Sequence, residues 1–67
     1  MTTTETVTFV LEGQHRQDLS WEKIGTYETE NAALEKKLIY QNYVDSGTVH
    51  GWLAFRVVRV TTIREIL

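Results

Sequence analysis

Two histidines, a serine and several carboxylates are the side chains of this 67-residue sequence whose chemistry could support catalysis. His15 lies in a polar stretch shortly before Ser20, and His50 lies far along the chain, just before Gly51. An imidazole base beside a hydroxyl can generate a nucleophile, but only when a third group orients the base inside a pocket. A chain this short has little room for such a pocket. We therefore expect both histidines to be exposed loop residues, and we predict a non-enzymatic protein with no catalytic residues.

A second set of side chains, two tryptophans and several cations, could bind single-stranded nucleic acid. Stacked rings and a positive surface are what such proteins use, and here they would come from Trp21, Trp52, Arg56 and Arg59. The sequence has no RNP-like aromatic strand and no GXXG loop, and its pI of about 5.6 is acidic. Tryptophan serves more often as a core or interface anchor. Nucleic-acid binding is therefore the alternative function.

Metal and cofactor sites are not expected. The sequence has no cysteine, which excludes disulfides and thiolate ligands, and the two histidines have no second ligand at a metal-like spacing. Gly47 and Gly51 flank a short stretch without phosphate-loop spacing, so they are interpreted as turn residues. Small domains are commonly stabilised by disulfides, a metal or a partner chain. Self-association is the one of these three that the sequence leaves open.

Composition indicates one folded domain over residues 1–67. Hydrophobic residues make up 42% and charged residues 24%. No apolar run approaches the ~20 residues that span a bilayer, and residues 1–5 lack the features of a secretory signal. We expect a cytoplasmic protein, in the host cytoplasm if it is viral. Residues 1–35 carry two basic and seven acidic side chains, a net −5, whereas residues 36–67 carry five and two, a net +3. Halves of opposite sign can neutralise each other within one molecule or between two copies.

Hydrophobic periodicity predicts two strands in the first half of the chain. Residues 4–12 alternate, with Val7, Phe9 and Leu11 on one side, which is typical of a half-buried strand. Residues 13–20 are polar and begin with glycine, so they are predicted to form a connecting loop. Residues 21–28 form a second predicted strand, in which Gly25 indicates a bulge or a close approach by a neighbour.

A helix and a third strand are predicted in the second half. Thr29 fits a helix N-cap, Glu30 suits the first turn, and good helix formers follow to about residue 44. Gly47 is a natural left-handed residue after the last turn. Residues 52–64 are β-branched and aromatic and form the third predicted strand.

The order ββαβ predicts an α+β fold of two layers, a three-stranded, mainly antiparallel sheet with one helix on one face. If the third strand lies beside the first, the strand order is 2-1-3 and the first strand is central. The order 1-2-3, with the third strand beside the second, is the alternative.

The third predicted strand is apolar on both faces, which one helix cannot cover. Val57 and Ile63 point to one side, and Val58 and Val60 point to the other. The helix has the same property. Ala32, Ala33, Ile39, Tyr40 and Tyr43 gather on one side and are expected to cover the sheet, while Leu34 and Leu38 lie nearly opposite. Large exposed apolar patches on small proteins usually mark contact surfaces.

These uncovered residues predict a protein-interaction module, with a second copy or another protein as the partner. The predicted interface draws on Leu34, Leu38, Trp52, Arg56, Val58 and Val60. The alternative without a partner is a twisted third strand, whose inner half lies under the helix and whose outer half is covered by the 13–20 loop.

The stretch from Trp21 to Thr29, followed by Ala33 and later by Phe55, Arg56, Val57 and Val58, resembles a pattern in small uncharacterised phage and prophage proteins. The pattern reads W-x-x-[IV]-G-x-[YF]-x-T-x-x-x-A, then [YF]-R-[VI]-[VI], and covers about half of the chain. The resemblance implies a phage-encoded accessory or host-modulating protein. It implies no active-site residue.

Overall fold

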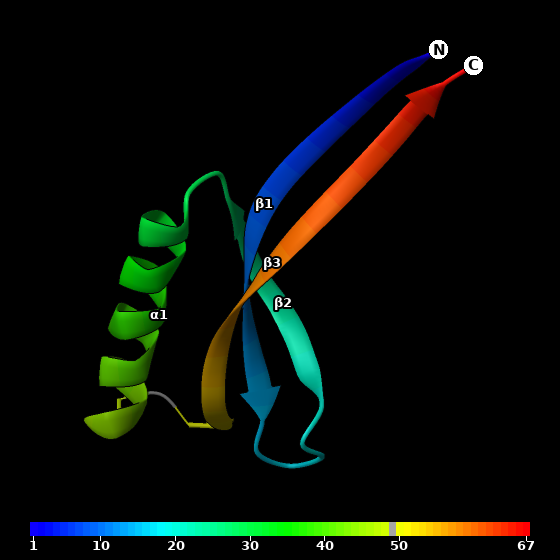
Figure 1. Cartoon of the computed structure of the whole chain (residues 1–67). Coiled ribbons are helices and arrows are strands. Elements are labelled where there is room, and N and C mark those ends of the chain that lie inside the picture. Colours follow the sequence, from blue (N-terminus) through cyan, green and yellow to red (C-terminus); the bar gives the residue numbers. More distant parts are fainter. Residues whose placement is uncertain (49) are drawn as a thin grey trace.

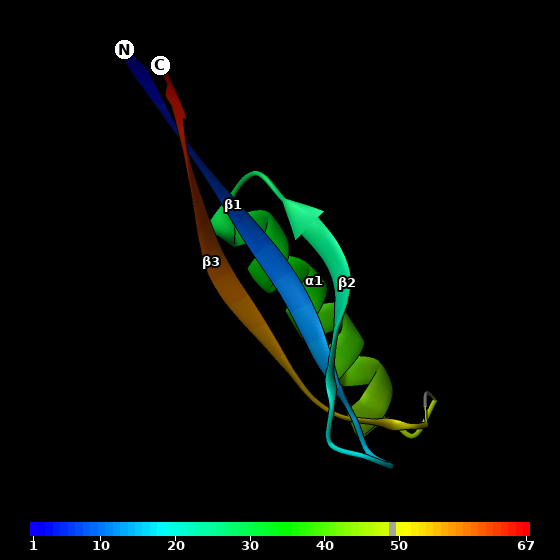
Figure 2. The same cartoon turned by 90° about the vertical axis from the view of Figure 1, so that its right-hand side faces the viewer.

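The computed structural model describes residues 1–48 and 50–67 as a curved three-stranded sheet with one helix (Figure 1). The elements follow in the order β1 (Thr2–His15), β2 (Trp21–Tyr27), α1 (Glu30–Asp45) and β3 (Trp52–Ile66). The strand order is β2-β1-β3, and both pairs are antiparallel. Figure 2 shows α1 behind the sheet, on one face only. The predicted fold class is confirmed, together with the strand order in which β1 is central.

The two ladders of β1 differ greatly in length. β1 pairs with β2 only between Phe9 and Gln14, whereas it pairs with β3 from Thr2 to His15. Residues Thr2–Thr8 and Val60–Ile66 therefore continue past β2 as a two-stranded ribbon, which we call the arm. Both chain ends lie at the tip of the arm, away from α1 (Figure 1).

The β1–β2 ladder contains an irregularity at the predicted position. Leu11 pairs with Gly25, but the next pair is Glu12 with Lys23, so the register shifts by one residue. A Cβ on Gly25 would lie 2.9 Å from the Tyr27 hydroxyl. Both features that a glycine inside a strand indicates, a bulge and a close approach, occur here.

The strand boundaries differ from those predicted by composition. β1 extends over residues 2–15 instead of 4–12, and β3 continues to Ile66 instead of ending at residue 64. The predicted 13–20 loop shrinks, since its first residues, Gly13, Gln14 and His15, all pair in the sheet. Polar residues are tolerated in these ladders because cross-strand partners, rather than intrinsic propensity, decide the pairing. The short loop lies at the opposite end of β3 from the arm (Figure 1), so its predicted role as a cover for the outer half of β3 is wrong.

The helix begins as predicted and faces the sheet differently. The Thr29 hydroxyl accepts a hydrogen bond from the Ala32 backbone N–H at 3.2 Å, and the left-handed Gly47 (φ 78°) follows the last turn. Ala33 is buried, and Lys37, Tyr40 and Val44 on the same side are half-buried. Ile39 and Tyr43, expected to cover the sheet, are 43% and 47% exposed. The helix is rotated relative to the expected orientation because the small Ala33 side chain allows α1 to approach the sheet closely. The aliphatic part of the Lys37 side chain is half-buried on the same side, while its ammonium group can reach solvent.

The core is small and lies mainly between α1 and the middle of the sheet. Leu11 is completely buried, Phe55 is 6% exposed, and Phe55 stacks with Tyr40 at a ring-centroid distance of 5.7 Å. Trp52 also neighbours Phe55, at a ring-centroid distance of 5.8 Å. As expected from the sequence, the single chain does not bury all the aliphatic side chains of β3, because Val60 and Ile63 remain 38% and 65% exposed.

Candidate interaction surface

The two faces of the sheet carry different side chains, and the strand register fixes their membership. Leu11 pairs with Val57 and Phe9 pairs with Arg59, so these residues lie on the face that α1 covers. Their neighbours lie on the opposite face, which we call the open face. Its members from β1 and β3 include the cross-strand pairs Val10–Val58, Glu12–Arg56 and Thr8–Val60.

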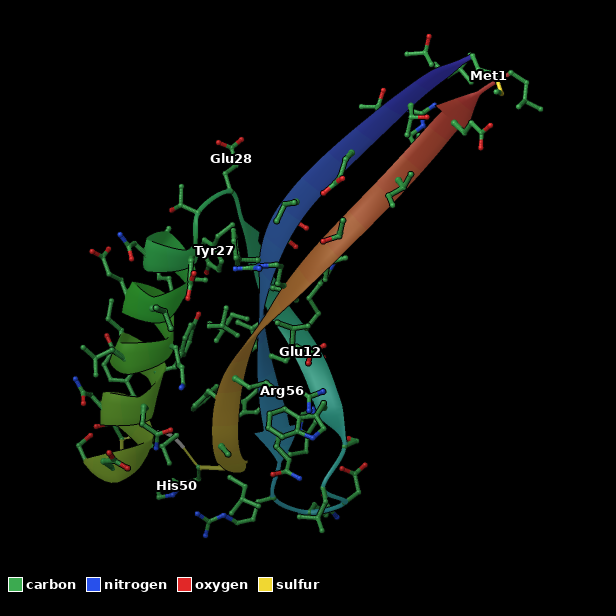
Figure 3. The ribbon with its side chains drawn as sticks, viewed as in Figure 1. Met1, Glu12, Tyr27, Glu28, His50 and Arg56 are labelled. Carbon is green, nitrogen blue, oxygen red and sulfur yellow. The ribbon has the colours of Figure 1, made fainter. Side chains whose placement is uncertain are left out.

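A polar cluster crosses the middle of the open face. The Arg56 Nε donates to the Glu12 carboxylate at 2.7 Å, and its guanidinium lies 3.9 Å from the Trp21 ring centroid. Figure 3 shows Glu12 and Arg56 together on the side of the sheet away from α1. Arg56 is therefore already engaged within the chain by an ion pair and a cation–π contact. Its predicted interface role would have to use the remaining exposed part of its side chain.

The four residues predicted for nucleic-acid binding do not share one surface. Trp21 and Arg56 lie on the open face, whereas Trp52 lies on the α1 side, where it stacks on His15 at 4.5 Å and neighbours Phe55. Arg59 also lies on the α1 side, 5.8 Å from the Phe9 ring centroid. A strand of bases could not contact all four on one face. Nucleic-acid binding stays a prediction without a supporting contact in the structure.

The residues predicted for a protein interface fall into two groups. Leu34 and Leu38 are exposed on α1, on the flank that faces β3. Arg56, Val58 and Val60 lie on the open face, and of these Val60 is the exposed aliphatic residue. Trp52 is half-buried against His15 and Phe55, so its ring mainly packs within the chain. Both groups border the outer edge of β3, which has no strand partner in the described residues.

A groove runs between α1 and the outer edge of β3. It consists of two adjoining hollows of about 310 and 470 Å³, which share Leu34 and Lys37 in their linings. Its lining combines apolar side chains with two cations, Lys37 and Arg59. The other lining residues are Phe9, Glu30, Leu38, Gln41, Phe55, Val57 and Arg59.

The arm adds apolar residues that sequence reasoning did not assign to a surface. Ile63, Ile66 and Leu67 are 65%, 56% and 96% exposed. The signal that could have found them is the β-branched run that continues to residue 66. Its counterpart is the threonine-rich segment at the other end of the chain, which pairs with it. Neither segment contains proline or lysine, which commonly protect exposed sheet edges.

The chain matches no family model, no curated protein and no solved structure. In the described residues no helix is long and apolar enough to cross a membrane. Within the same part of the chain, no three metal-ligating side chains cluster. The phage-type resemblance stays a prediction from the sequence pattern.

The side chains that could have formed a catalytic group are hydrogen-bonded to other residues instead of to each other. The His15 ring pairs with Glu22 at 2.9 Å, while the Ser20 hydroxyl donates to Asp18 at 2.7 Å. His15 lies at the end of β1 and is half-buried, so its expected loop position is wrong, whereas His50 is exposed outside the strands as expected. The non-enzymatic character of the protein stays a prediction.

The turn between β1 and β2 is held by Asp18. The His15 backbone N–H donates to the Ser20 carbonyl at 2.8 Å, and Leu19 takes a left-handed conformation (φ 62°). The Asp18 carboxylate accepts hydrogen bonds from the Ser20 hydroxyl at 2.7 Å and from the Ser20 backbone N–H at 3.0 Å. These bonds stabilise the charged form, so they lower the pKa of Asp18 below 3.8.

Asp18 should therefore make stability depend on pH in the acidic range. Because its folded pKa is lower than the unfolded value of 3.8, ionised Asp18 favours the folded state above that pH. Its contribution is lost as the pH falls through the lowered folded pKa. Urea unfolding of the wild type and of Asp18→Asn should differ at pH 7, and the difference should shrink at a pH well below 3.8. An equal difference at both pH values would contradict the assignment.

Proposed function

We propose that this chain is a non-enzymatic protein-interaction module that forms a homodimer through the outer edge of β3. The observation that carries the proposal is the exposure of this edge together with its aliphatic side chains. Val60, Ile63 and Ile66 are all exposed along it, and the groove beside α1 opens next to it. Unpaired strand edges present backbone N–H and C=O groups that readily pair with another strand.

Burial of these side chains would add to a small margin of stability. Fully burying a Val or Ile contributes roughly 1.5–3 kcal/mol, and a domain of this size has a total stability of about 5 kcal/mol. The buried apolar residues of the described chain are Val10, Leu11, Ala33 and Phe55. A partner that covers the β3 edge would extend this core.

A second copy of the chain is the simplest partner. Two-fold pairing brings the same edge of two molecules together in antiparallel fashion and closes the assembly at a dimer. From the sequence resemblance, we propose a phage-encoded accessory or host-modulating role in the host cytoplasm.

Sedimentation equilibrium tests the proposed association directly. The wild-type chain should sediment at about twice its mass of 7.8 kDa, and Val60→Arg should sediment as a monomer, because a guanidinium would be buried at the interface. Val60 is already exposed in the single chain, so the substitution should leave the circular dichroism spectrum unchanged.

Ile39→Arg is the matched control. Ile39 is exposed to a similar extent as Val60, but it lies on the flank of α1 away from Leu34 and Leu38. The same charge introduced there should leave the dimer intact. A wild-type chain that sediments as a monomer at all protein concentrations would overturn the proposal.

A further inference from the structure

We propose that the arm segment of β3 pairs antiparallel with the same segment of a second copy, with Thr62 directly opposite Thr62. This inference rests on the proposed homodimer and specifies its register. The product would be a continuous sheet in the order β2-β1-β3-β3-β1-β2, with both helices on the same face. The arm, shown at the top of Figure 1, would form the centre of this sheet.

The outer edge of β3 suits this pairing better than the free edge of β1. β1 has an unpaired outer edge only over Thr2–Thr8, because β2 occupies the edge from Phe9 onward. That segment carries threonines and one acid, Glu5, and it has no cation to meet the acid of a second copy. The outer edge of β3 is unpaired along its whole described length and carries Arg56, Arg59, Arg64 and Glu65.

Sheet geometry restricts the possible registers. A two-fold axis normal to the sheet keeps each face on its own side, so residues directly opposite each other must lie on the same face. Side chains alternate between the faces, so Glu65 shares a face with Arg59 but not with Arg56 or Arg64. Arg59 and Glu65 is therefore the only Arg–Glu pair of β3 that can stand directly opposite each other. The register that achieves this is centred on Thr62, and symmetry forms the pair twice.

Arg59 and Glu65 are available for such a pair. Within the chain, Arg59 faces Phe9 of β1 and Glu65 faces Thr3, so neither has an opposite charge across the ladder. The ion pairs found in the described residues involve His15 with Glu22 and Arg56 with Glu12. Two competing registers place like charges opposite each other: with a centre at Arg59 that residue faces itself, and with a centre at Val60 Arg56 faces Arg64. Registers centred on Thr61 or Ile63 avoid this repulsion but leave Arg59 and Glu65 opposite uncharged residues. Like charges directly opposite each other destabilise a sheet.

The same register gives Ile66 and Leu67 apolar neighbours, whereas Val60 falls opposite Arg64 and Ile63 opposite Thr61. Ile66 falls opposite Val58 of the second copy on the open face. Leu67 falls opposite Val57 on the α1 side, where the groove lined by Leu34 and Lys37 opens. Ile66 and Leu67 are 56% and 96% exposed in the single chain, and both would be covered. The register centred on Thr62 thus combines the Arg59–Glu65 ion pair with apolar cover for Ile66 and Leu67.

Cysteine cross-linking tests the register, and the chain suits it because it has no cysteine of its own. Residues directly opposite in an antiparallel pair have Cα atoms about 4.5–5.5 Å apart, within the range of a disulfide. Thr62→Cys should therefore form a covalent dimer rapidly and nearly completely under mild oxidation, as seen on a non-reducing gel. An equimolar mixture of Val60→Cys and Arg64→Cys should form the mixed disulfide in preference to either homodimer.

Thr4→Cys provides the background rate of collisional cross-linking, because Thr4 lies in the arm on β1, opposite Arg64. If Thr62→Cys cross-links no faster than Thr4→Cys while the wild type sediments as a dimer, the register is overturned and the proposed homodimer stands. If the wild type is a monomer, both proposals fail together.

A charge exchange gives an independent measurement. Arg59→Glu and Glu65→Arg should each weaken the dimer about tenfold, because each replaces two exposed ion pairs by repulsions. The double variant Arg59→Glu/Glu65→Arg should recover most of the wild-type dissociation constant. Single variants that dimerise as tightly as the wild type, or a double variant weaker than both, would overturn the register.

Discussion

Leu11→Ala should unfold a large fraction of the protein at 37 °C. Leu11 is the large side chain that is completely buried, in the part of β1 that pairs with both β2 and β3 and lies under α1. Truncation of a buried leucine typically costs about 2–5 kcal/mol, from lost transfer energy and the cavity left behind. The whole domain is stable by only about 5 kcal/mol, so the loss is comparable to the total.

Urea denaturation followed by tryptophan fluorescence measures this effect. Val7→Ala is the matched control, since Val7 lies on the same strand and the same face but is 39% exposed. It should cost well under half as much as Leu11→Ala, because it removes little buried surface. If both variants lose the same stability, the core is not where the structure places it.

Gly13→Ala should be the second most damaging substitution, although it adds only a methyl group. A Cβ at Gly13 would lie 2.7 Å from two ring atoms of Trp52 and 2.9 Å from the Ile24 side chain. The Trp52 ring cannot easily retreat, because it stacks on His15 and neighbours Phe55. Overpacking of this kind costs about 1–3 kcal/mol.

A second glycine and a rescue variant separate this steric effect from backbone effects. Gly25→Ala should cost less than Gly13→Ala, because its Cβ would meet mainly the Tyr27 hydroxyl, the far end of a side chain that can rotate. In a Trp52→Leu background, Gly13→Ala should cost clearly less than in the wild type, since the two ring atoms nearest the added methyl group are removed and the end of the Ile24 side chain remains as the close neighbour. Thermal unfolding of the wild type, Gly13→Ala, Trp52→Leu and the double variant Gly13→Ala/Trp52→Leu measures the coupling between the two positions. If Gly13→Ala costs as much in the Trp52→Leu background as in the wild type, the steric explanation fails.

Local signals in the sequence were sufficient to predict the helix and most of the strands. Thr29 and Gly47 mark the ends of α1 through backbone geometry that depends on a few neighbours. Alternation around Phe9 and Leu11 fixes the face of β1 that meets the core. The end of β1 was missed because Gly13, Gln14 and His15 have loop-like composition, and their strand conformation depends on partners elsewhere in the chain.

The candidate surface was predictable in part. The sequence shows that β3 and α1 carry apolar residues on more than one face, which is more than one helix packed on one sheet face can bury. Leu34, Leu38 and Val60 are indeed exposed. The groove was not predictable, because it depends on where α1 lies across the sheet. The contacts of Arg56 with Glu12 and Trp21 were also missed, because they depend on how three separate strands pair in the sheet.

The long ladder between β1 and β3 also determines the order in which the molecule can assemble. Pairing Thr2 with Ile66 closes almost the entire chain into a loop, whereas β1 and β2 are joined by a short turn. Contacts between residues distant in sequence form late, because their closure entropy must be overcome first. The β1–β2 hairpin should therefore form early, and the tip of the arm should close last. In an isolated chain, amide hydrogens near that tip should exchange with solvent fastest, and association should slow them.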